Sequence, residues 1–304
     1  MKNYPAEIKT APPQRSEAAS LLSDSVTASV WLPDYVLRLR QNIHRCDCPG
    51  CEGASPLLQF KWRNHIRHSA DISCSRAAAE ILCPTASCTI VFSEDAAEHL
   101  PELPAEFLEM NRRCLRLFEV FRAEPALLLY VLGCFIREAA TLAPQQRAAL
   151  AEEWLRPTAC QQLMQHFFRD CEDREYPPLA PQNLQALPLW LPIDRDARLQ
   201  KLQGMEQMNG DQLRQKWRKL QSASGLRKRT RQKILSNYLF YELCHNFFPG
   251  NFQSDWESNF ASLCRHMLTL KLLLTVVPQG ADKESVGALF AAGYRTAREQ
   301  IYAK

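Results

Sequence analysis

The chain has 304 residues, which is enough for one large domain or two of ordinary size. Its hydrophobic fraction of 46% and charged fraction of 23% are typical of a soluble globular protein, and a net charge of +4 does not by itself indicate binding to nucleic acid. The first twenty-five residues contain no apolar stretch typical of a secretory signal, and the longest uncharged apolar run, 126–136, is too short to span a membrane. We therefore expect a cytoplasmic protein, with no membrane association, whose cysteines are thiols or metal ligands rather than disulfides.

Two common nucleotide-binding motifs are absent from the sequence. The chain has only ten glycines, and neither G-x-G-x-x-G nor G-x-x-x-x-G-K-[ST] occurs. The sequence therefore gives no support for a Rossmann nucleotide site or a P-loop.

The N-terminal third shows few regular elements. Residues 1–28 are polar, and we expect a flexible tail. A short helix is predicted from Pro33 to about Ile43, because proline suits the first helical position. A second helix is predicted over 75–82, with Ser73 or Ser75 as its N-cap. The β-branched run 88–92 is the only clear strand signal.

From Pro104 onward the pattern is helical. Apolar residues recur every three or four positions up to Phe121, a new helix starts at Pro125, and further helices are predicted over 145–155 and 159–171. Five prolines then fall within sixteen residues of the segment 172–210, which favours an extended connector. We expect Trp190 of this connector to fill a groove on the helical body.

The C-terminal part contains four predicted helices and a basic stretch. The helices cover 211–221, 226–247, a segment that starts with the capping box Ser254–Glu257, and a last segment capped by Asp282. The basic run, Arg214 to Lys233, has nine Lys or Arg and no Asp or Glu. Such a run is usually a solvated face, and it can also dock an acidic partner or a phosphate backbone. Trp217 is the only aromatic residue in the run, so a nucleic-acid partner has little support.

Together these patterns predict a mainly α protein. It comprises a multi-helix, bundle-like body, a small cysteine-rich N-terminal segment and a proline-rich crossing loop. The predicted division is a tail at 1–28, the cysteine-rich segment at 29–100, a central helical region at 101–171, the connector at 172–210 and a C-terminal helical region at 211–304.

The cysteine-rich stretch from Arg45 to Cys88 is the most informative part of the chain. It holds six of the twelve cysteines and, together with His44 directly before it, three of the seven histidines. Cys48-Pro-Gly-Cys51 favours a tight turn that lets two sulfurs face one centre, and Cys46 adds a third thiol. Thiolates and imidazoles bind zinc and iron–sulfur clusters. The alternative is a set of reduced cysteines that pack as small hydrophobic residues.

Several segments together resemble the flagellin lysine-N-methylases of bacteria. In the C-terminal half these are Asn237–Phe240, Phe247–Pro249, a leucine-rich helix around Lys271 and the helix ending in 294–299. Residues 115–121 and 125–142 are similar to the central helical pair of that family. Asp71–Ala78 resembles its serine–cysteine motif, and Pro33–Tyr35 followed by 46–51 is similar to its N-terminal start. The resemblance covers most of residues 30–300.

The resemblance implies a lysine N-methyltransferase that acts on flagellin, with S-adenosylmethionine as methyl donor and an iron–sulfur or other metal centre. Its matched metal-ligand positions are Cys46, Cys48, Cys51 and Cys74. This chain departs from the family in one respect: only about twenty residues separate Cys51 from Cys74, where the family has a longer cysteine-rich region.

Lysine methylation requires a neutral amine, so a site must desolvate the substrate lysine or supply a base. The candidate aromatic walls are Tyr238, Tyr241, Trp256 and Tyr294, all of which also suit the core. Glu242 and Glu257 are candidate bases that sequence spacing does not separate, and His245 and His266 are expected to be ordinary packed or surface histidines. The sequence assigns no catalytic or donor-binding residue.

Two other interpretations remain open at this stage. The chain could be a noncatalytic helical binding protein, with a structural zinc site and the basic run as its docking patch. It could also be a degenerate copy of the methylase that folds without catalysing a reaction.

Overall fold

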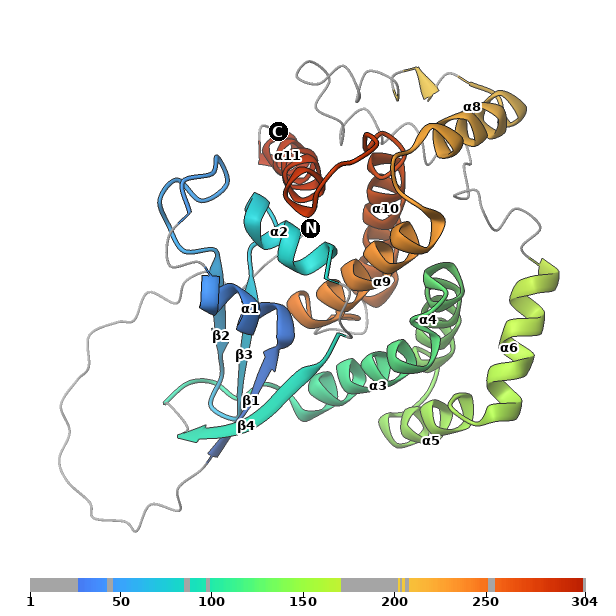
Figure 1. Cartoon of the computed structure of the whole chain (residues 1–304). Helices are drawn as coiled ribbons and strands as arrows, with labels where there is room; N and C mark the ends of the chain where they lie inside the picture. Colours follow the sequence, from blue (N-terminus) through green and yellow to red (C-terminus); the bar gives the residue numbers. More distant parts are fainter. Residues whose placement is uncertain are drawn as a thin grey trace, which may run out of the picture.

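A small β-sheet lies beside a larger helical body in the computed structural model (Figure 1). The structure describes residues 27–42, 46–84, 88–96, 99–170, 202, 204–205, 208–250 and 255–302. Most of these residues are helical, so the predicted mainly α class is confirmed. None of the helices in these ranges is long and apolar enough to cross a membrane.

Two helices belong to the N-terminal part and eight to the helical body. The first two are α1 (Asp34–Asn42) and α2 (Ser75–Leu82). The remaining helices are α3 (Ala105–Phe121), α4 (Pro125–Ala139), α5 (Pro144–Trp154), α6 (Pro157–Asp170), α8 (Gly210–Ala223), α9 (Lys228–His245), α10 (Trp256–Leu273) and α11 (Lys283–Tyr302). Each of the helices expected from sequence periodicity is present in these ranges.

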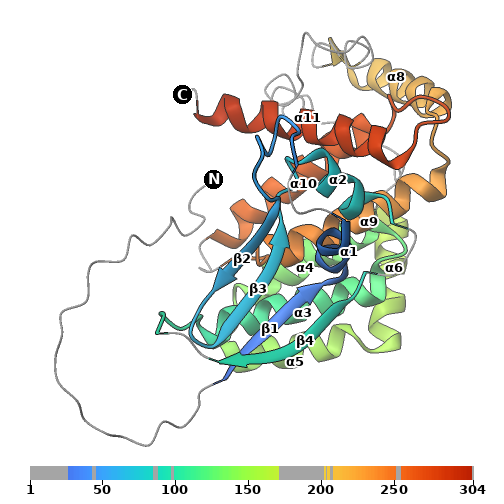
Figure 2. The same cartoon turned by 60° about the vertical axis from the view of Figure 1, so that its left-hand side comes forward.

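The sheet has four strands, of which the sequence predicted only the last. The strands are β1 (Thr27–Pro33), β2 (Leu57–Lys61), β3 (His65–Ala70) and β4 (Ile90–Ala96), in the order β2-β3-β1-β4. β1 pairs parallel with β3, and the other pairs are antiparallel (Figure 2). The expectation of a single strand was wrong because β3 is buried on both faces yet carries polar side chains, which hides the alternation that marks a strand.

These polar side chains of β3 join the sheet to the helical body. The Arg67 guanidinium is fully buried between two aromatic rings, 4.3 Å from the centre of Trp31 and 3.8 Å from the centre of Phe247. It donates hydrogen bonds to Asn111 Oδ1 of α3 (2.9 Å) and to the Cys244 carbonyl of α9 (3.0 Å). A planar guanidinium can stack and donate in this way at once, so one side chain links three elements.

Helix α9 lies in the centre of the body and is buried along almost its whole length from Ile234 onward. Tyr238 and Tyr241 of this helix, like Trp256 of α10, are buried core residues, whereas Tyr294 of α11 is partly buried. The first three candidate aromatic walls therefore contribute to packing.

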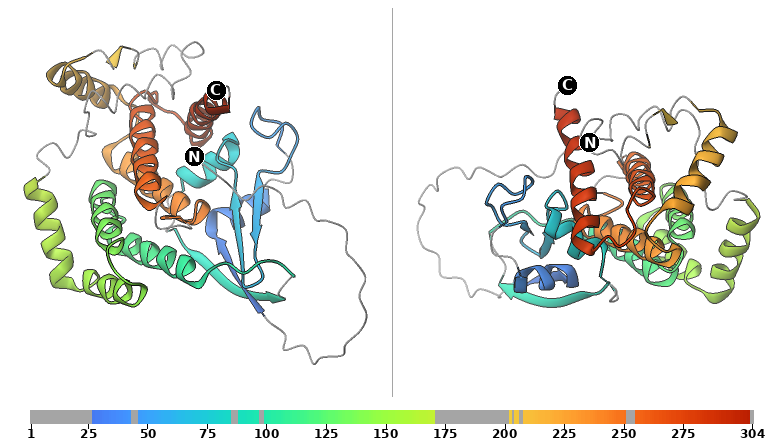
Figure 3. Two further views of the ribbon diagram at one scale, coloured as in Figure 1. Left: turned by 180° about the vertical axis from the view of Figure 1, so that it is seen from behind. Right: turned by 45° about the horizontal axis from the view of Figure 1, so that its top comes forward.

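Helix α11 packs closely on α2, as Figures 1 and 3 show from opposite sides. A Cβ atom at Gly287 would lie 2.5 Å from the Ser75 carbonyl oxygen and 2.6 Å from the Ala79 nitrogen. Only glycine permits this approach of the two backbones. Asp282 caps α11 as predicted, because its Oδ1 accepts a hydrogen bond from the Ser285 amide at 2.8 Å.

The predicted capping box at Ser254–Glu257 stays a prediction, because Ser254 lies outside the described residues. Helix α10 begins at Trp256 with Asp255 as its N-cap, and the Asp255 side chain makes no capping hydrogen bond. The tail before Thr27, Trp190 and nearly all of the proline-rich connector also lie outside the described residues.

Candidate functional site

The four cysteines that the resemblance matched come together in space. The sulfur atoms of Cys46, Cys48, Cys51 and Cys74 all lie within 4.8 Å of one another. The Cys46 and Cys74 sulfurs, which are buried, are 3.6 Å apart, and the other two cysteines are partly buried. This is a group of four potential metal ligands.

The hairpin formed by β2 and β3 explains why Cys74 reaches the other three. The two strands are antiparallel, and the Asp71 amide donates to the Pro56 carbonyl at 2.8 Å. The chain therefore returns at Asp71 to the end of the hairpin that it left at Pro56. Cys74, three residues after Asp71, is thereby brought back to Cys51, five residues before Pro56. Recognition of both strands in the sequence would have predicted this contact.

The loop that carries the first three cysteines is a tight turn. The amides of Cys51 and Glu52 donate to the Cys48 carbonyl at 2.9 and 3.1 Å, and the Gly53 amide donates to the Cys46 carbonyl at 3.1 Å. A Cβ at Gly50 would lie 2.3 Å from the Ser73 carbonyl oxygen, so this glycine lets the loop touch the segment that precedes α2. The predicted tight turn at Pro49–Gly50 is confirmed.

The fourth cysteine is the N-cap of α2. The Cys74 sulfur accepts a hydrogen bond from the Ala77 amide at 3.4 Å, so the expectation that Ser73 or Ser75 caps the helix was wrong. A cysteine sulfur can replace a hydroxyl oxygen here because the first amides of a helix lack partners. The positive end of the helix dipole also favours a thiolate at this position.

The thiols have different acidities. Burial alone raises the pKa of the Cys48 thiol, but hydrogen bonds from the Ser75 and Gly50 backbone lower it to about 6. Burial raises the pKa of Cys74 to about 11, although the Ala77 amide opposes this. Burial also raises the pKa of Cys51. Thiols must lose their protons to bind a metal, so metal binding at this group would release protons.

The remaining ligand-type side chains of this segment lie elsewhere. The Cys83 sulfur is 3.8 Å from the Lys283 carbonyl, and the Cys88 sulfur is 3.1 Å from Asn237 Oδ1. His65 and His68 lie on β3, where they contact Ser29 and Arg40. These residues are not part of the four-cysteine group.

A second polar cluster lies between α9, α10 and α11. The Glu242 carboxylate is buried, accepts a hydrogen bond from the Tyr238 hydroxyl at 2.5 Å and another from the Asn246 amide, and lies 3.7 Å from His266 Nδ1. Burial alone raises the pKa of the Glu242 carboxyl, but the His266 imidazole and these hydrogen bonds lower it below its usual value. Glu242 is therefore a buried carboxylate at neutral pH.

Helix α11 connects the two clusters through consecutive residues. The Tyr294 ring lies 6.3 Å from the His266 ring, and Arg295 donates a hydrogen bond of 2.6 Å to the carbonyl of Ser73, the neighbour of Cys74. The sequence alone gives no reason to group Glu242, His266 and Tyr294. Their proximity depends on how α9, α10 and α11 pack, for which local periodicity gives no signal.

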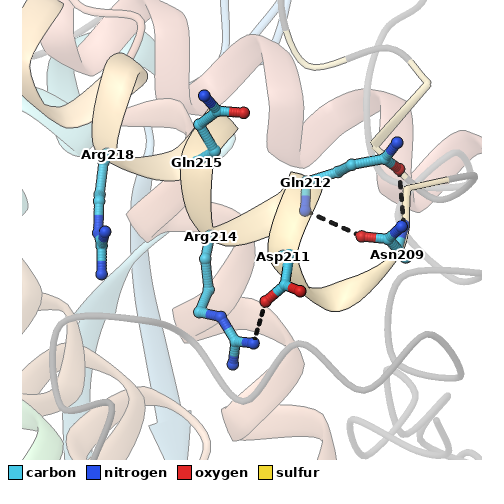
Figure 4. A pocket seen from close by; sticks show the side chains of 6 residues that line it. All are labelled: Asn209, Asp211, Gln212, Arg214, Gln215 and Arg218. Carbon is cyan, nitrogen blue, oxygen red and sulfur yellow. Dashed lines mark hydrogen bonds and ion pairs between the residues drawn. The ribbon is translucent and has the colours of Figure 1, made fainter.

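A surface pocket of about 570 Å³ lies at the start of α8 (Figure 4). Asn209 and Gln212 form a capping box there, and Arg214 pairs with Asp211. Arg214 and Arg218, both exposed, belong to the basic run. The run is exposed at most of its charged positions on α8 and the first turn of α9, whereas Trp217 is fully buried and unable to stack on a base.

The fold and the site together define a mainly helical protein with a group of four cysteines at the N-terminus of one helix. Residues 129–296, more than half of the chain, match the FliB lysine N-methylase C-terminal domain. The chain therefore belongs to the FliB lysine N-methylase family, as the resemblance predicted. No curated protein and no solved structure matches the chain.

Proposed function

We propose that the chain is a protein-lysine N-methyltransferase of the cytoplasm that acts on flagellin with S-adenosylmethionine as methyl donor. The family match over 129–296 carries this proposal, since it covers α5, α6, α8, α9, α10 and most of α4 and α11. Glu242, His266 and Tyr294 all lie within the matched range.

The reaction needs a neutral amine at the substrate lysine. The amine nitrogen attacks the methyl carbon of the donor, the bond between that carbon and sulfur breaks, and S-adenosylhomocysteine leaves. The proton of the amine must pass to a base before or after the attack. Free lysine is almost fully protonated at neutral pH, so the enzyme has to shift this equilibrium.

We propose His266 as the proton acceptor, with Glu242 as its positioning residue. The His266 side chain is 11% exposed, and Glu242, 5% exposed, lies beside its Nδ1 atom. A carboxylate beside an imidazole orients the ring and stabilises the imidazolium that forms when the ring takes a proton. The other candidate, Glu257, is exposed at the first turn of α10. The partly buried ring of Tyr294 beside His266 can accommodate the methylated ammonium.

Methyl transfer to purified flagellin tests the proposed activity. The protein is incubated with flagellin and S-adenosylmethionine, and modified lysines are located by peptide mass spectrometry. Methylated lysines that require both the protein and the donor are expected. Unmodified flagellin in an assay with folded protein would contradict the proposal.

Three variants test the proposed base. His266→Asn is expected to lower kcat by about 10²-fold or more, the usual effect of losing a general base, with little change in KM for flagellin. Glu242→Gln is expected to lower kcat less and to shift the pH profile, because the imidazole remains. Glu257→Gln is the matched control and should leave the rate unchanged. Equal rates for His266→Asn and the control would exclude His266 as the base.

A noncatalytic binding protein is the second candidate function, and the compact four-cysteine group favours it as a structural zinc site. In either case we propose that the basic run docks an acidic partner through its exposed cations. Replacing Arg227, Lys228 and Arg229 with Glu should weaken partner binding and remove its salt dependence. Unchanged binding would show that this face is only solvated.

A further inference from the structure

We infer that Cys46, Cys48, Cys51 and Cys74 hold a single zinc ion in a closed, structural site, and that no iron–sulfur cluster is built on them. The family resemblance implies an iron–sulfur or other metal centre. The arrangement of the four sulfur atoms in this chain fits a single ion rather than a cluster.

The distances between the sulfurs decide between the two centres. A tetrahedral zinc ion with Zn–S bonds of about 2.3 Å holds its four sulfurs about 3.8 Å from one another. In a four-iron cluster each cysteine binds a different iron, so the sulfurs are spread roughly 6 Å apart around the cluster. Here all four lie within 4.8 Å, and one pair is separated by 3.6 Å. The group is the size of one ion.

The number of ligands also defines the kind of site. Four thiolates complete the coordination of a tetrahedral ion, whereas a catalytic centre keeps a position open for water or substrate. A set made only of thiolates is typical of zinc among the divalent ions. The methyl donor therefore binds elsewhere and is not a ligand of this metal.

The surroundings suit the net negative charge of a four-thiolate zinc site. Cys74 is the N-cap of α2, and backbone amides at this end of the helix point toward the sulfurs of Cys48 and Cys74. The positive end of the helix dipole compensates part of the excess charge. The Arg295 guanidinium, bound to the Ser73 carbonyl, adds a cation close by.

The role of the ion follows from the elements that it joins. Three ligands come from the loop between α1 and β2, and the fourth starts α2, which packs on α11 and α9. The described part of this loop, residues 46–56, contains turns but no helix or strand, so the metal supplies a cross-link that fixes it to α2. Zinc in such a site contributes directly to folding stability.

Metal analysis of the wild-type protein, purified without oxygen, is the first test. One zinc per chain without acid-labile sulfide is expected. X-ray absorption should show four sulfurs at about 2.3 Å and no neighbouring metal atom. Iron with labile sulfide, one iron without sulfide, or a chain without metal would each overturn the assignment.

Two cysteine variants test the ligands. Cys51→Ser should reduce bound zinc from one per chain to a small fraction of that value. Cys83→Ser is the matched control, because Cys83 is also partly buried and sits at the other end of α2; it should retain full zinc. Full zinc in Cys51→Ser, or equal loss in both variants, would refute the assignment. If Cys51→Ser fails to fold, the X-ray absorption spectrum of the wild-type protein still decides whether the four cysteines bind zinc.

The zinc site lies in the same chain that we propose as a methyltransferase, but its assignment does not depend on methyltransferase activity. Zinc with methyl transfer supports both proposals, zinc without methyl transfer contradicts only the enzyme, and an iron–sulfur cluster in an active methylase contradicts only the zinc site.

Discussion

Replacing Gly287 with alanine tests whether the contact between α11 and α2 is as close as the structure shows. Gly287 lies inside α11 and faces α2. The new Cβ would lie 2.5 Å from the Ser75 oxygen, 2.6 Å from the Ala79 nitrogen and 2.8 Å from the Ala79 Cβ. Two of these three atoms are backbone, so no side-chain rotation can relieve the contact, and the helices must separate by about 1 Å to restore van der Waals distances.

The net effect is the difference of two contributions. Overpacking of a closely packed contact costs about 1–3 kcal/mol, and the upper part of this range applies because backbone must move. Alanine in place of glycine inside a helix stabilises it by about 1 kcal/mol. We therefore expect Gly287→Ala to lower the free energy of unfolding by about 1–2 kcal/mol. At about 2–4 °C per kcal/mol, this corresponds to a decrease in Tm of several degrees.

Gly210→Ala is the matched control for this substitution. Gly210 is the first residue of α8, and a Cβ there meets no atom within 4 Å. Its replacement should leave Tm unchanged or raise it slightly. Thermal unfolding followed by far-UV circular dichroism measures both variants. The packing argument is wrong if Gly287→Ala is as stable as Gly210→Ala, or more stable than the wild type.

Three further predictions concern the sheet and the metal. Burial and the charge of Arg67 lower the pKa of His65 from 6.5 to about 3. The stability that neutral His65 contributes is therefore complete above pH 6.5 and is lost as the pH falls toward 3. The Tm of the His65→Gln variant should depend less on pH over this range than the Tm of the wild type. Arg67→Lys should destabilise the protein by about 2–3 kcal/mol in urea unfolding, because lysine cannot both stack and keep the bonds to Asn111 and Cys244. A strong chelator should lower the Tm of the wild type and leave that of Cys51→Ser unchanged; equal shifts would argue against metal at the four cysteines.

The helices were predictable from sequence, whereas the sheet was not, and one strand explains the difference. Apolar periodicity located helices of the body that bury one stripe of side chains, whereas α9 is buried on all sides from Ile234 onward. In β3, by contrast, His65, Arg67 and Ser69 are buried and bind groups from other elements. Most of these hydrogen bonds go to partners far away in the sequence, so no local rule identifies the three residues as buried.

The candidate site, like the fold, was predictable from sequence only where it depends on short stretches of chain. The C-x-C-x-x-C spacing predicted the loop with its three thiols, since a tight turn acts over a few residues. Cys74 was assigned only through the family resemblance, because its approach to Cys51 depends on the β2–β3 hairpin. Glu242 lies on α9 and His266 on α10, so the contact between them depends on how these two helices rotate against each other.

A structural metal can still control the rate of methyl transfer through the geometry of α11. In the proposed site zinc would fix the start of α2. Arg295 ties α11 to that same point, and the preceding residue, Tyr294, faces His266. Because a displacement of about 1 Å in a reacting group can cost 10²-fold in rate, loosening α2 should reduce activity even when no substrate touches the metal. Loss of activity after zinc removal is thus expected for a structural site as well. The X-ray absorption spectrum separates the two roles, since a closed site keeps four sulfur ligands when S-adenosylmethionine binds, whereas a catalytic metal would gain a ligand.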